Sequence, residues 1–461
     1  MNDKEYSRRE DFRQLKNEIR GSKEYLIVGI DIAKDRHHAF FGTATGNTLL
    51  KRLVFDNTQE GFEKLLVHAE AVKAEHTLEK TVFGLEPTAD YHKPLGEFLI
   101  KGSHEVVLVS GVAVKRNREL LDGRWDKHDT KDAANVADLI SQGKCLFYNY
   151  PSLPLRELRA LMSLKRRLKK QEHGIKARIR NHLLAQYFPE LDRYYGQSES
   201  NGLAVVRWCL NPSMLAAMDY AHFVQLVAPH TQSLAPQERL RSIWQTAGES
   251  IGCEAGDALG FEAEVMVEEL EHIRALIRAT DEKIEEICLQ FPEYHSLLTI
   301  PGFGPDVSSK VLAAIGNPFR FTTGAQVLKM AGLDLSADRS GKGSESATPV
   351  LSKKGKADLR YALYQAALIA SIRNTYFMRY YTHTLRVREK EKGIKTKMQV
   401  KLAAKLLIIV YPVKCEAYFT GAWTLMKRKE AFNTPEAYKS CVSHDRVTTL
   451  PMFGGRARVR T

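Results

Sequence analysis

The stretch Tyr25-Leu-Ile-Val-Gly-Ile-Asp31 decides the fold of the N-terminal part of this chain. It is a short apolar run, rich in β-branched residues, that ends on an acid, which is typical of a buried strand. Two further β-rich runs follow at 37–43 and 48–55, and residues 44–47 form a turn between them with Gly46 and Asn47. Three successive strands are therefore expected at the start of the domain.

Helices and strands alternate beyond these three runs. We expect, in chain order, a helix at 60–72, a strand at 81–85, a helix at 91–100, a strand at 106–109 and a helix from about residue 130. Three leading strands followed by such an alternation is the order of a ribonuclease-H-like sheet. The sequence thus predicts a mixed α/β domain.

The second half of the chain predicts an all-α organisation. An Arg-, Lys- and Leu-rich helix is expected at 155–187, and a second long helix carries apolar residues at an unbroken 3,4 spacing over 263–291. That spacing is typical of a coiled-coil seam, although Lys165 and Glu172 fall on the apolar stripe of the first helix. An antiparallel pair with 190–258 inserted between its helices is the simplest arrangement, and a seam between two chains is the alternative.

These changes in pattern divide the chain into five segments. They are a helical arm at 1–22, the mixed sheet domain at 23–150, the coiled-coil helices with their insert at 151–292, a compact helical domain at 293–420 and a polar tail at 421–461. The fold class expected is α/β plus all-α.

The charge of the chain is unevenly distributed. The net charge is +13, yet residues 1–150 carry 23 Lys and Arg against 24 Asp and Glu, while residues 151–461 carry 45 against 31. A basic excess of this size indicates a surface that binds a polyanion. No apolar run is long enough for a membrane span and the N-terminus has no secretion signal, so a cytoplasmic location is expected. Six scattered cysteines without a C-x-x-C pair favour reduced, structural thiols.

Four acids occupy positions that are typical of a metal site. Asp31 ends the first strand in G-I-D-I-A-K, Glu86 follows a later strand in F-G-L-E-P-T, and Asp129 and Asp132 share one helical face in K-H-D-T-K-D-A. Carboxylates so gathered repel one another unless cations intervene, and two Mg²⁺ ions can clamp the attacking and leaving oxygens of a phosphodiester. Each acid taken alone is more often a helix cap or turn residue. Lys34 is a candidate phosphate contact.

Two downstream stretches suggest contacts to a nucleic-acid backbone. In I-P-G-F-G-P, Gly302 and Gly304 resemble the glycines of a helix-hairpin-helix turn, which let amides approach a phosphate, and a plain helical corner is the alternative. The loop at 336–344 places serine hydroxyls among cations that would stabilise an alkoxide, and a flexible basic loop is the alternative. Further candidate backbone contacts are Arg339, Lys342, Lys353, Lys354, Lys356, Arg360 and the basic run at 386–397.

Taken together, these motifs resemble one family. The order of the four acids, with the K-x-D-x-x-D-A string and the G-I-D-I-A-K start, resembles the RuvC-like DEDD domain of the insertion-sequence one-ten family of transposases. The run I-P-G-F-G-P, A-G-L, R-S-G, S-K-K-G and L-R-Y-A-L is similar to the C-terminal transposase domain of that family. The resemblance covers about 23–190 and 260–415.

The resemblance implies a DNA recombinase guided by a structured bridge RNA that pairs with donor and target DNA. It implies that the DEDD carboxylates bind Mg²⁺ and act with a serine of a partner subunit, which forms a covalent phosphoserine link to DNA in a dimer or tetramer. By motif this serine is Ser340 in R-S-G, with Ser336, Ser344 and Ser346 as neighbouring alternatives. A nucleoid-associated protein of a bacterial or archaeal cell is expected.

Two other functions are compatible with the same residues. A junction-resolving or hydrolytic nuclease would cut with water at the four acids, and the serine loop would then only bind backbone. A non-catalytic nucleic-acid-binding protein would keep the fold and tolerate Asp31→Ala and Glu86→Ala.

Overall fold

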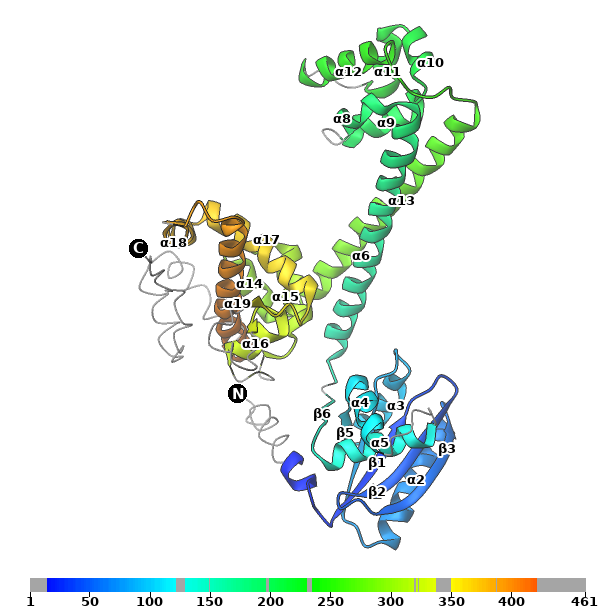
Figure 1. Cartoon of the computed structure of the whole chain (residues 1–461), viewed down its shortest axis with the longest axis vertical. Helices are drawn as coiled ribbons and strands as arrows, with labels where there is room; N and C mark the ends of the chain where they lie inside the picture. Colours follow the sequence, from blue (N-terminus) through cyan, green and yellow to red (C-terminus); the bar gives the residue numbers. More distant parts are fainter. Residues whose placement is uncertain are drawn as a thin grey trace, which may run out of the picture. The chain divides into compact units, whose positions relative to one another are not determined.

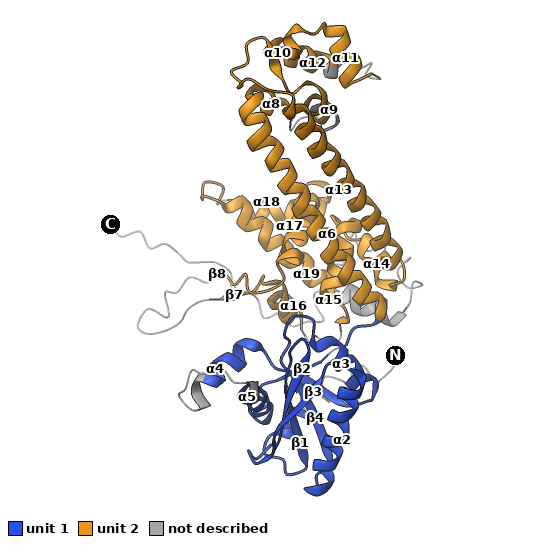
Figure 2. Ribbon diagram, turned by 90° about the vertical axis from the view of Figure 1, so that its right-hand side faces the viewer, with its two compact units in different colours: residues 1–152 blue, residues 153–461 orange. Residues whose placement is uncertain are grey.

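The structure is a computed structural model (Figure 1), and it describes residues 15–121, 129–148, 150–195, 199–229, 234–318, 321, 323–336, 350–386 and 388–420. The chain forms two compact units, Met1–Ser152 and Leu153–Thr461, which are coloured separately in Figure 2. Each unit is treated by itself below. No helix in the described part of the chain is long and apolar enough to cross a membrane.

Unit 1 is built on a six-stranded mixed sheet with the strand order β3-β2-β1-β4-β5-β6. The strands are β1 (Tyr25–Asp31), β2 (Arg36–Thr43), β3 (Thr48–Asp56), β4 (Lys80–Leu85), β5 (Glu105–Leu108) and β6 (Leu146–Phe147). The first three strands pair antiparallel, β1, β4 and β5 are parallel, and β6 is antiparallel to β5. This arrangement fits the ribonuclease-H-like sheet that the sequence predicts.

Four helices cover the two faces of this sheet. They are α2 (Gln59–Glu75), α3 (His92–Lys101), α4 (Gly111–Leu121) and α5 (Asp129–Ser141). Leu26, Val28 and Ile30 of β1 pack in one core cluster with residues of α2 and α3. Tyr25 and Ile27 pack on the opposite face with residues of α4 and α5. Because side chains alternate along a strand, every odd-numbered residue of β1 faces α5.

Two glycines let α5 lie directly on the sheet. A Cβ on Gly29 of β1 would overlap the backbone oxygen of Ala133, and one on Gly84 of β4 would overlap the side chain of Ile140. The two glycines are paired in register on neighbouring strands. The close approach of α5 to β1 and β4 therefore depends on the absence of side chains at these two positions.

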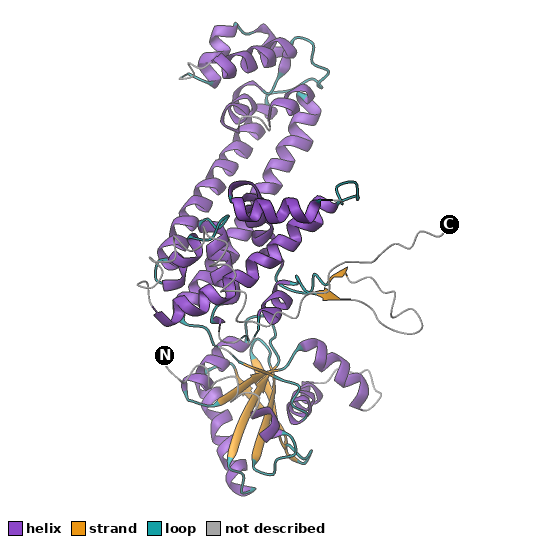
Figure 3. Ribbon diagram, turned by 90° about the vertical axis from the view of Figure 1, so that its left-hand side faces the viewer, coloured by secondary structure: helices purple, strands orange, loops and turns teal. Residues whose placement is uncertain are grey.

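The described part of unit 2 is helical apart from one short pair of strands (Figure 3). Its first part holds α6 (Leu153–Arg178), a π-helical turn (Ile179–Leu184), α7 (Ala185–Tyr187), α8 (Asp192–Tyr195), α9 (Glu199–Cys209), α10 (Pro212–Ala217), α11 (Tyr220–Val227), α12 (Leu234–Ala247) and α13 (Ala258–Cys288). Its second part holds α14 (Pro292–Leu298), α15 (Pro305–Ile315), α16 (Gly324–Ala331), β7 (Leu335–Ser336), β8 (Val350–Leu351), α17 (Ala357–Arg373), α18 (Thr375–Leu385) and α19 (Ile394–Thr420).

The long helices α6 and α13 lie side by side and form an arm (Figures 1 and 2). The 3,4-spaced positions of α13 from Ala263 to Ile284 are buried, and Ile287 is partly buried. Lys165 bonds Asp281 of α13 and Asp306 of α15, each at 2.6 Å, which accounts for a lysine on the apolar stripe of α6. The segment 190–258 folds as the short helices α8–α12, which share a core cluster with the far end of this pair.

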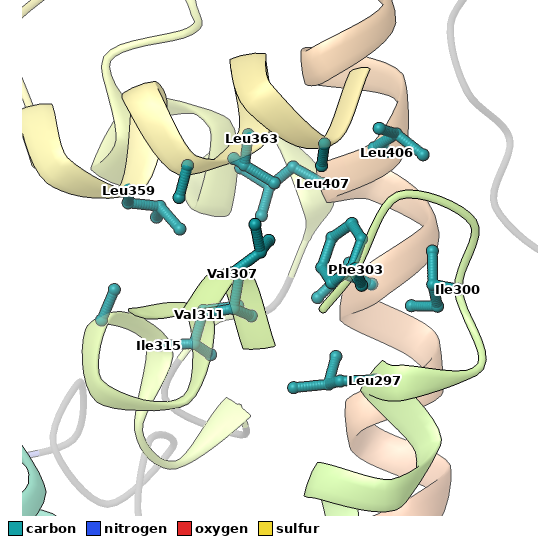
Figure 4. Packing of buried hydrophobic residues seen from close by; sticks show 14 of the residues in the cluster. Leu297, Ile300, Phe303, Val307, Val311, Ile315, Leu359, Leu363, Leu406 and Leu407 are labelled. Carbon is teal, nitrogen blue, oxygen red and sulfur yellow. The ribbon is translucent and has the colours of Figure 1, made fainter. Parts of the chain in front are cut away.

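The helices α14 to α19 enclose a second core (Figure 4). Leu297, Phe303 and Val311 point toward Leu363 of α17 and Leu407 of α19, and all five side chains are buried. The turn between α14 and α15 is thus fastened by apolar packing against α17 and α19. This core carries the I-P-G-F-G-P turn and the β7–β8 hairpin.

Candidate functional site

Asp31 and Glu86 lie at the ends of neighbouring parallel strands. The β1–β4 register pairs Gly29 with Gly84 and Ile30 with Leu85, and the amide of Glu86 donates to the carbonyl of Ile30 at 3.5 Å. The next position on each strand is therefore Asp31 and Glu86. Both are two residues beyond a glycine that contacts α5, so both side chains project to the face of the sheet that α5 covers.

Glu86 also meets the beginning of α4. Its Oε1 lies 2.7 Å from the position that a Cβ on Gly111 would occupy, and Gly111 is the first residue of that helix. A carboxylate at a helix N-terminus is stabilised by the helix dipole and by unpaired amides. The contact lies at the edge of the sheet, and a residue larger than glycine at 111 would displace the Glu86 carboxylate.

Asp132 is buried on α5 and forms an ion pair with Arg118 of α4. It directly precedes Ala133, whose carbonyl lies against Gly29, two residues before Asp31. Asp132 is therefore on the same face of the sheet as Asp31 and Glu86. The Arg118 guanidinium compensates its charge, because a buried carboxylate without a cation would be costly.

A buried polar seam fixes α4 against α5. Asn117 Nδ2 donates to Asn135 Oδ1 at 2.6 Å and to Asp138 Oδ2 at 2.7 Å, and Asn135 Nδ2 donates to the carbonyl of Val114 at 2.7 Å. Asn135 is fully buried and Asn117 nearly so. Because every bond in this seam links the two helices, the seam sets the distance of Arg118 from Asp132.

Two histidines flank Asp31, and the sequence patterns did not single out either of them. His38 is the cross-strand partner of Asp31 in the β1–β2 register, so its side chain is on the same face. His37 faces the other core, where its Nδ1 accepts from the amide of Ala33 at 3.3 Å. Burial lowers the pKa of His37, which keeps the ring neutral and able to accept this bond. The signal was available as a His-His pair at the start of the second strand.

The described side chains supply part of the set of oxygen donors that a divalent ion needs. Among them, no group of three or more His, Cys, Asp or Glu is placed to hold a metal ion. Asp31 and Glu86 are adjacent oxygen donors and fit a cation, whereas Asp132 is engaged by Arg118. The side chain of Asp129, the first residue of α5, lies outside the described part. The observed site therefore offers two adjacent carboxylates and a third that is already neutralised.

The two glycines of the I-P-G-F-G-P turn have different surroundings. Gly302 has a φ of 87°, and a Cβ there would overlap the backbone oxygen of Ala366 in α17. Gly304 precedes α15, and a Cβ there would meet no atom within 4 Å. Gly302 is needed for helix packing, so only Gly304 has open space on its Cα. Asp306 in the first turn of α15 bonds Lys165 and Lys310, each at 2.6 Å.

The base of the β7–β8 hairpin is held by basic side chains bonded to backbone carbonyls. Arg360 Nη1 donates to the carbonyl of Ala331 at 2.9 Å, and Lys356 Nζ donates to that of Ala314 at 2.9 Å. Ser352 Oγ donates to a carboxylate oxygen of Asp334. These contacts give Arg360 and Lys356 partners within the protein, and their contact with phosphate stays a prediction.

The remaining predicted residues divide into exposed and undescribed ones. Lys34, Lys353 and Lys354 are exposed. Ser340, with Arg339 and Lys342, lies outside the described residues, as do the alternatives Ser344 and Ser346. The hairpin strands Leu335–Ser336 and Val350–Leu351 bracket this undescribed stretch.

Family models of transposases match two separate parts of the chain. A DEDD transposase family model matches residues 28–189, and a model described as "Transposase IS116/IS110/IS902 family" matches residues 294–382. The first match contains Asp31, Glu86 and Asp132, and the second contains the I-P-G-F-G-P turn and the β7–β8 hairpin.

Three curated relatives carry related descriptions. Two are from Streptomyces coelicolor. The "Insertion element IS110 uncharacterized 43.6 kDa protein" is 25% identical over 68% of this chain and 77% of the relative. The "Mini-circle putative transposase for IS117" is 24% identical over 66% of this chain and 74% of the relative. The third is the "Pilin gene-inverting protein" of Moraxella bovis, 25% identical over 85% of this chain and 96% of the relative.

An acid-bearing ribonuclease-H-like sheet followed by a helical domain with these likenesses defines a DNA transposase or recombinase. Within that class, the chain belongs to the IS110 family of transposases, because both of its family matches name that family and they fall in the expected order.

Proposed function

We propose that this transposase cuts and rejoins DNA by serine attack at an acid site that binds Mg²⁺. The observation that carries the proposal is the adjacency of Asp31 and Glu86 on parallel strand ends, on the sheet face where α5 presents Asp132. Mg²⁺ bound by these oxygens would withdraw charge from a phosphodiester oxygen. Arg118 is bonded to Oδ1 of Asp132, so its positive charge opposes the binding of a cation at this third carboxylate.

The chain's own residues would then perform an exchange of phosphate esters. The hydroxyl of Ser340 loses its proton and forms a bond from Oγ to phosphorus, while a bond from phosphorus to a bridging sugar oxygen breaks and that oxygen takes up a proton. Attack by a sugar hydroxyl of the joining strand reverses the exchange and frees the serine. One ester is replaced by another at each step, so no external energy source is needed.

The product of strand cleavage tests this chemistry. We expect a DNA strand covalently attached to the protein, which disappears in Ser340→Ala and in Asp31→Asn but persists in Ser344→Ala. Free DNA ends with no attached protein, formed equally well by Ser340→Ala, would instead indicate a hydrolytic nuclease. Joining that survives Asp31→Asn and Glu86→Gln would show that the acids have no catalytic role.

We also propose that a structured RNA selects the DNA sites and that the active unit is a homo-oligomer. The basic excess of residues 151–461 supports an additional polyanionic partner beyond the DNA. If base pairing reads the target, the protein needs no side-chain code for sequence. Sequencing of the nucleic acid that copurifies with the protein should yield one defined RNA species, and a random mixture of cellular RNA would contradict guidance.

A further inference from the structure

The two helices of the arm carry opposite charge. Helix α6 has nine Lys and Arg against two acids, whereas α13 has nine Asp and Glu against three Lys and Arg. The exposed acids of α13 are Glu268, Glu269, Glu271, Glu282, Glu285 and Glu286. A polyanion that approaches the arm is therefore repelled by α13 and attracted to α6.

Most basic residues of α6 are already used within the protein. Arg166 bonds Asp358 at 3.3 Å, Lys165 bonds two aspartates, and Lys169 and Lys176 both bond Glu172, at 3.0 and 3.1 Å. Each of these side chains therefore already has a carboxylate partner within the protein.

Three other basic residues of α6 are exposed and have no such partner. Within the described part of the chain, no ion pair or hydrogen bond involves the side chains of Arg167, Lys170 or Arg178. Their spacing is three and eight residues, which places them on one face of a helix. The α6 residues buried in the arm, including Leu168 and Ile175, occupy a neighbouring stripe about 100° around the helix.

Glycine occupies the gap between Lys170 and Arg178. Gly174 is exposed, and a Cβ built there would meet no atom within 4 Å. The four positions, which we call the α6 stripe (Arg167, Lys170, Gly174 and Arg178), extend over about 16 Å of helix. A stripe with cations at both ends and a bare backbone between them allows a phosphate chain to approach closely.

We propose that the α6 stripe binds the phosphodiester backbone of a nucleic acid, independently of sequence. This goes beyond the assignment of the acid site, since it gives the arm a direct contact with DNA or RNA. It rests on the nucleic-acid chemistry of the family and not on the serine mechanism, so it can fail while that mechanism stands. Neither the acid site nor Ser340 takes part in it.

The experiment compares two double variants of the full-length protein. Arg167→Gln with Lys170→Gln removes two charges from the stripe, and the control, Arg278→Gln with Lys283→Gln, removes two charges from α13 of the same arm. Binding to a 30-base-pair duplex DNA and to an RNA hairpin is measured by fluorescence anisotropy across a salt series. Circular dichroism and the oligomeric state, measured by sedimentation, verify that both variants fold like the parent.

We expect the stripe variant to lower the slope of log affinity against log salt by about 1.8, and the control to leave it unchanged. The loss of affinity between roughly 50 and 200 mM salt should then be about tenfold smaller than in the parent. If the slope changes for the DNA duplex alone, the stripe binds DNA. If it changes for the RNA hairpin alone, the stripe binds RNA. Equal slopes for both double variants, or a change in sedimentation in place of binding, would overturn the proposal.

Discussion

At the residue scale, Arg118 brings a positive charge to the acid site. It comes from α4, pairs with the buried Asp132, and is kept in place by the Asn117–Asn135 seam. A cation bound by Asp31 and Glu86 would have to compete with this guanidinium for the third carboxylate. The arginine therefore stabilises the protein in the absence of metal and opposes the binding of metal.

Arg118→Gln is expected to destabilise the metal-free protein by about 3 kcal/mol, because a buried carboxylate then lacks a cation. Addition of Mg²⁺ should raise the midpoint temperature of thermal unfolding more in this variant than in the parent, because the ion then neutralises the carboxylate in place of the arginine. Differential scanning fluorimetry across a Mg²⁺ titration measures both effects. Lys115→Gln, at an exposed position of α4, is the matched control, and equal Mg²⁺ responses in all three proteins would refute the competition.

At the scale of elements, the contact of α5 with the sheet positions the acids. Gly29 and Gly84 bring the helix backbone close to the strand ends that carry Asp31 and Glu86. The arm has a comparable dependence on single residues, because the buried Glu172 of α6 bonds Lys169, Lys176 and Arg274.

Gly29→Ala should force α5 away from β1, because its methyl group would overlap the carbonyl of Ala133. We expect a loss of about 2 kcal/mol in the free energy of unfolding, typical of overpacking, and a larger loss of strand cleavage than the stability change explains. Urea denaturation and cleavage assays on one preparation give both values. Gly260→Ala on α13, where the φ is not positive and a Cβ would meet no atom within 4 Å, is the control for introducing a side chain at a glycine. Undiminished cleavage by folded Gly29→Ala would show that this contact does not position the acids.

Glu172 should make the arm sensitive to acid. Burial raises the pKa of this carboxyl, but hydrogen bonds from Lys169 and Lys176 outweigh burial and lower the pKa to about 2. A lowered pKa contributes stability that is complete above the unfolded value of 4.5 and is lost as the pH falls toward 2. The contribution is on the order of 3 kcal/mol at neutral pH.

Glu172→Gln should therefore lower the free energy of unfolding at pH 7, and the difference from the parent should narrow below about pH 4.5. Chemical denaturation at a series of pH values measures this difference. Glu157→Gln, at an exposed position of the same helix, should show no such trend. A difference that stays constant from pH 7 to pH 3 would contradict the assigned pKa.

Particular elements show what the sequence could and could not predict. The strands β1 to β5 and the helices α2, α3 and α13 were expected, because each buries an apolar stripe of the correct period. Helix α4 was not expected from the sequence. It is held against α5 by buried side-chain amides, and a search for periodic apolar residues does not detect such contacts. The same cause hides the Arg118–Asp132 pair from sequence patterns, because the pair depends on the position of α4.

The sequence predicts the acids of the candidate site better than its basic residues. Motif order predicts that Asp31, Glu86, Asp129 and Asp132 gather, since strand ends and helix faces follow from local pattern. The structure has Asp31, Glu86 and Asp132 on one face of the sheet, and the side chain of Asp129 lies outside the described part. The roles of Lys356 and Arg360 depend on carbonyls that only the tertiary structure brings to them. Charge alone does not distinguish a lysine that binds phosphate from one that caps a helix.

At the scale of the whole molecule, the proposal places the acids and the serine in different units of one chain. The acids belong to unit 1, and the hairpin that brackets Ser340 belongs to unit 2. An assembly of chains can then build a composite site from the acids of one subunit and the serine of another.

Mixing two inactive variants tests this composite site. Asp31→Asn and Ser340→Ala should each be inactive alone, and a mixed assembly should regain strand cleavage, because one composite site then has both groups intact. Cleavage is measured after the two proteins are mixed and allowed to exchange subunits, with each variant alone as the reference. No recovery in assemblies proven to be mixed would show that acids and serine act within one chain.

Lys165 has a mechanical consequence. Its ammonium group touches Asp281 at the inner end of the arm and Asp306 at the first turn of α15, so a single cation joins a long lever to the segment from which α15 starts. The same junction is also packed by Leu158 of α6 and by Ile284 and Cys288 of α13, which share the core of the helices α14 to α19. We expect Lys165→Met, which keeps the stem and removes the charge, to loosen the joint and leave each of the two joined parts folded.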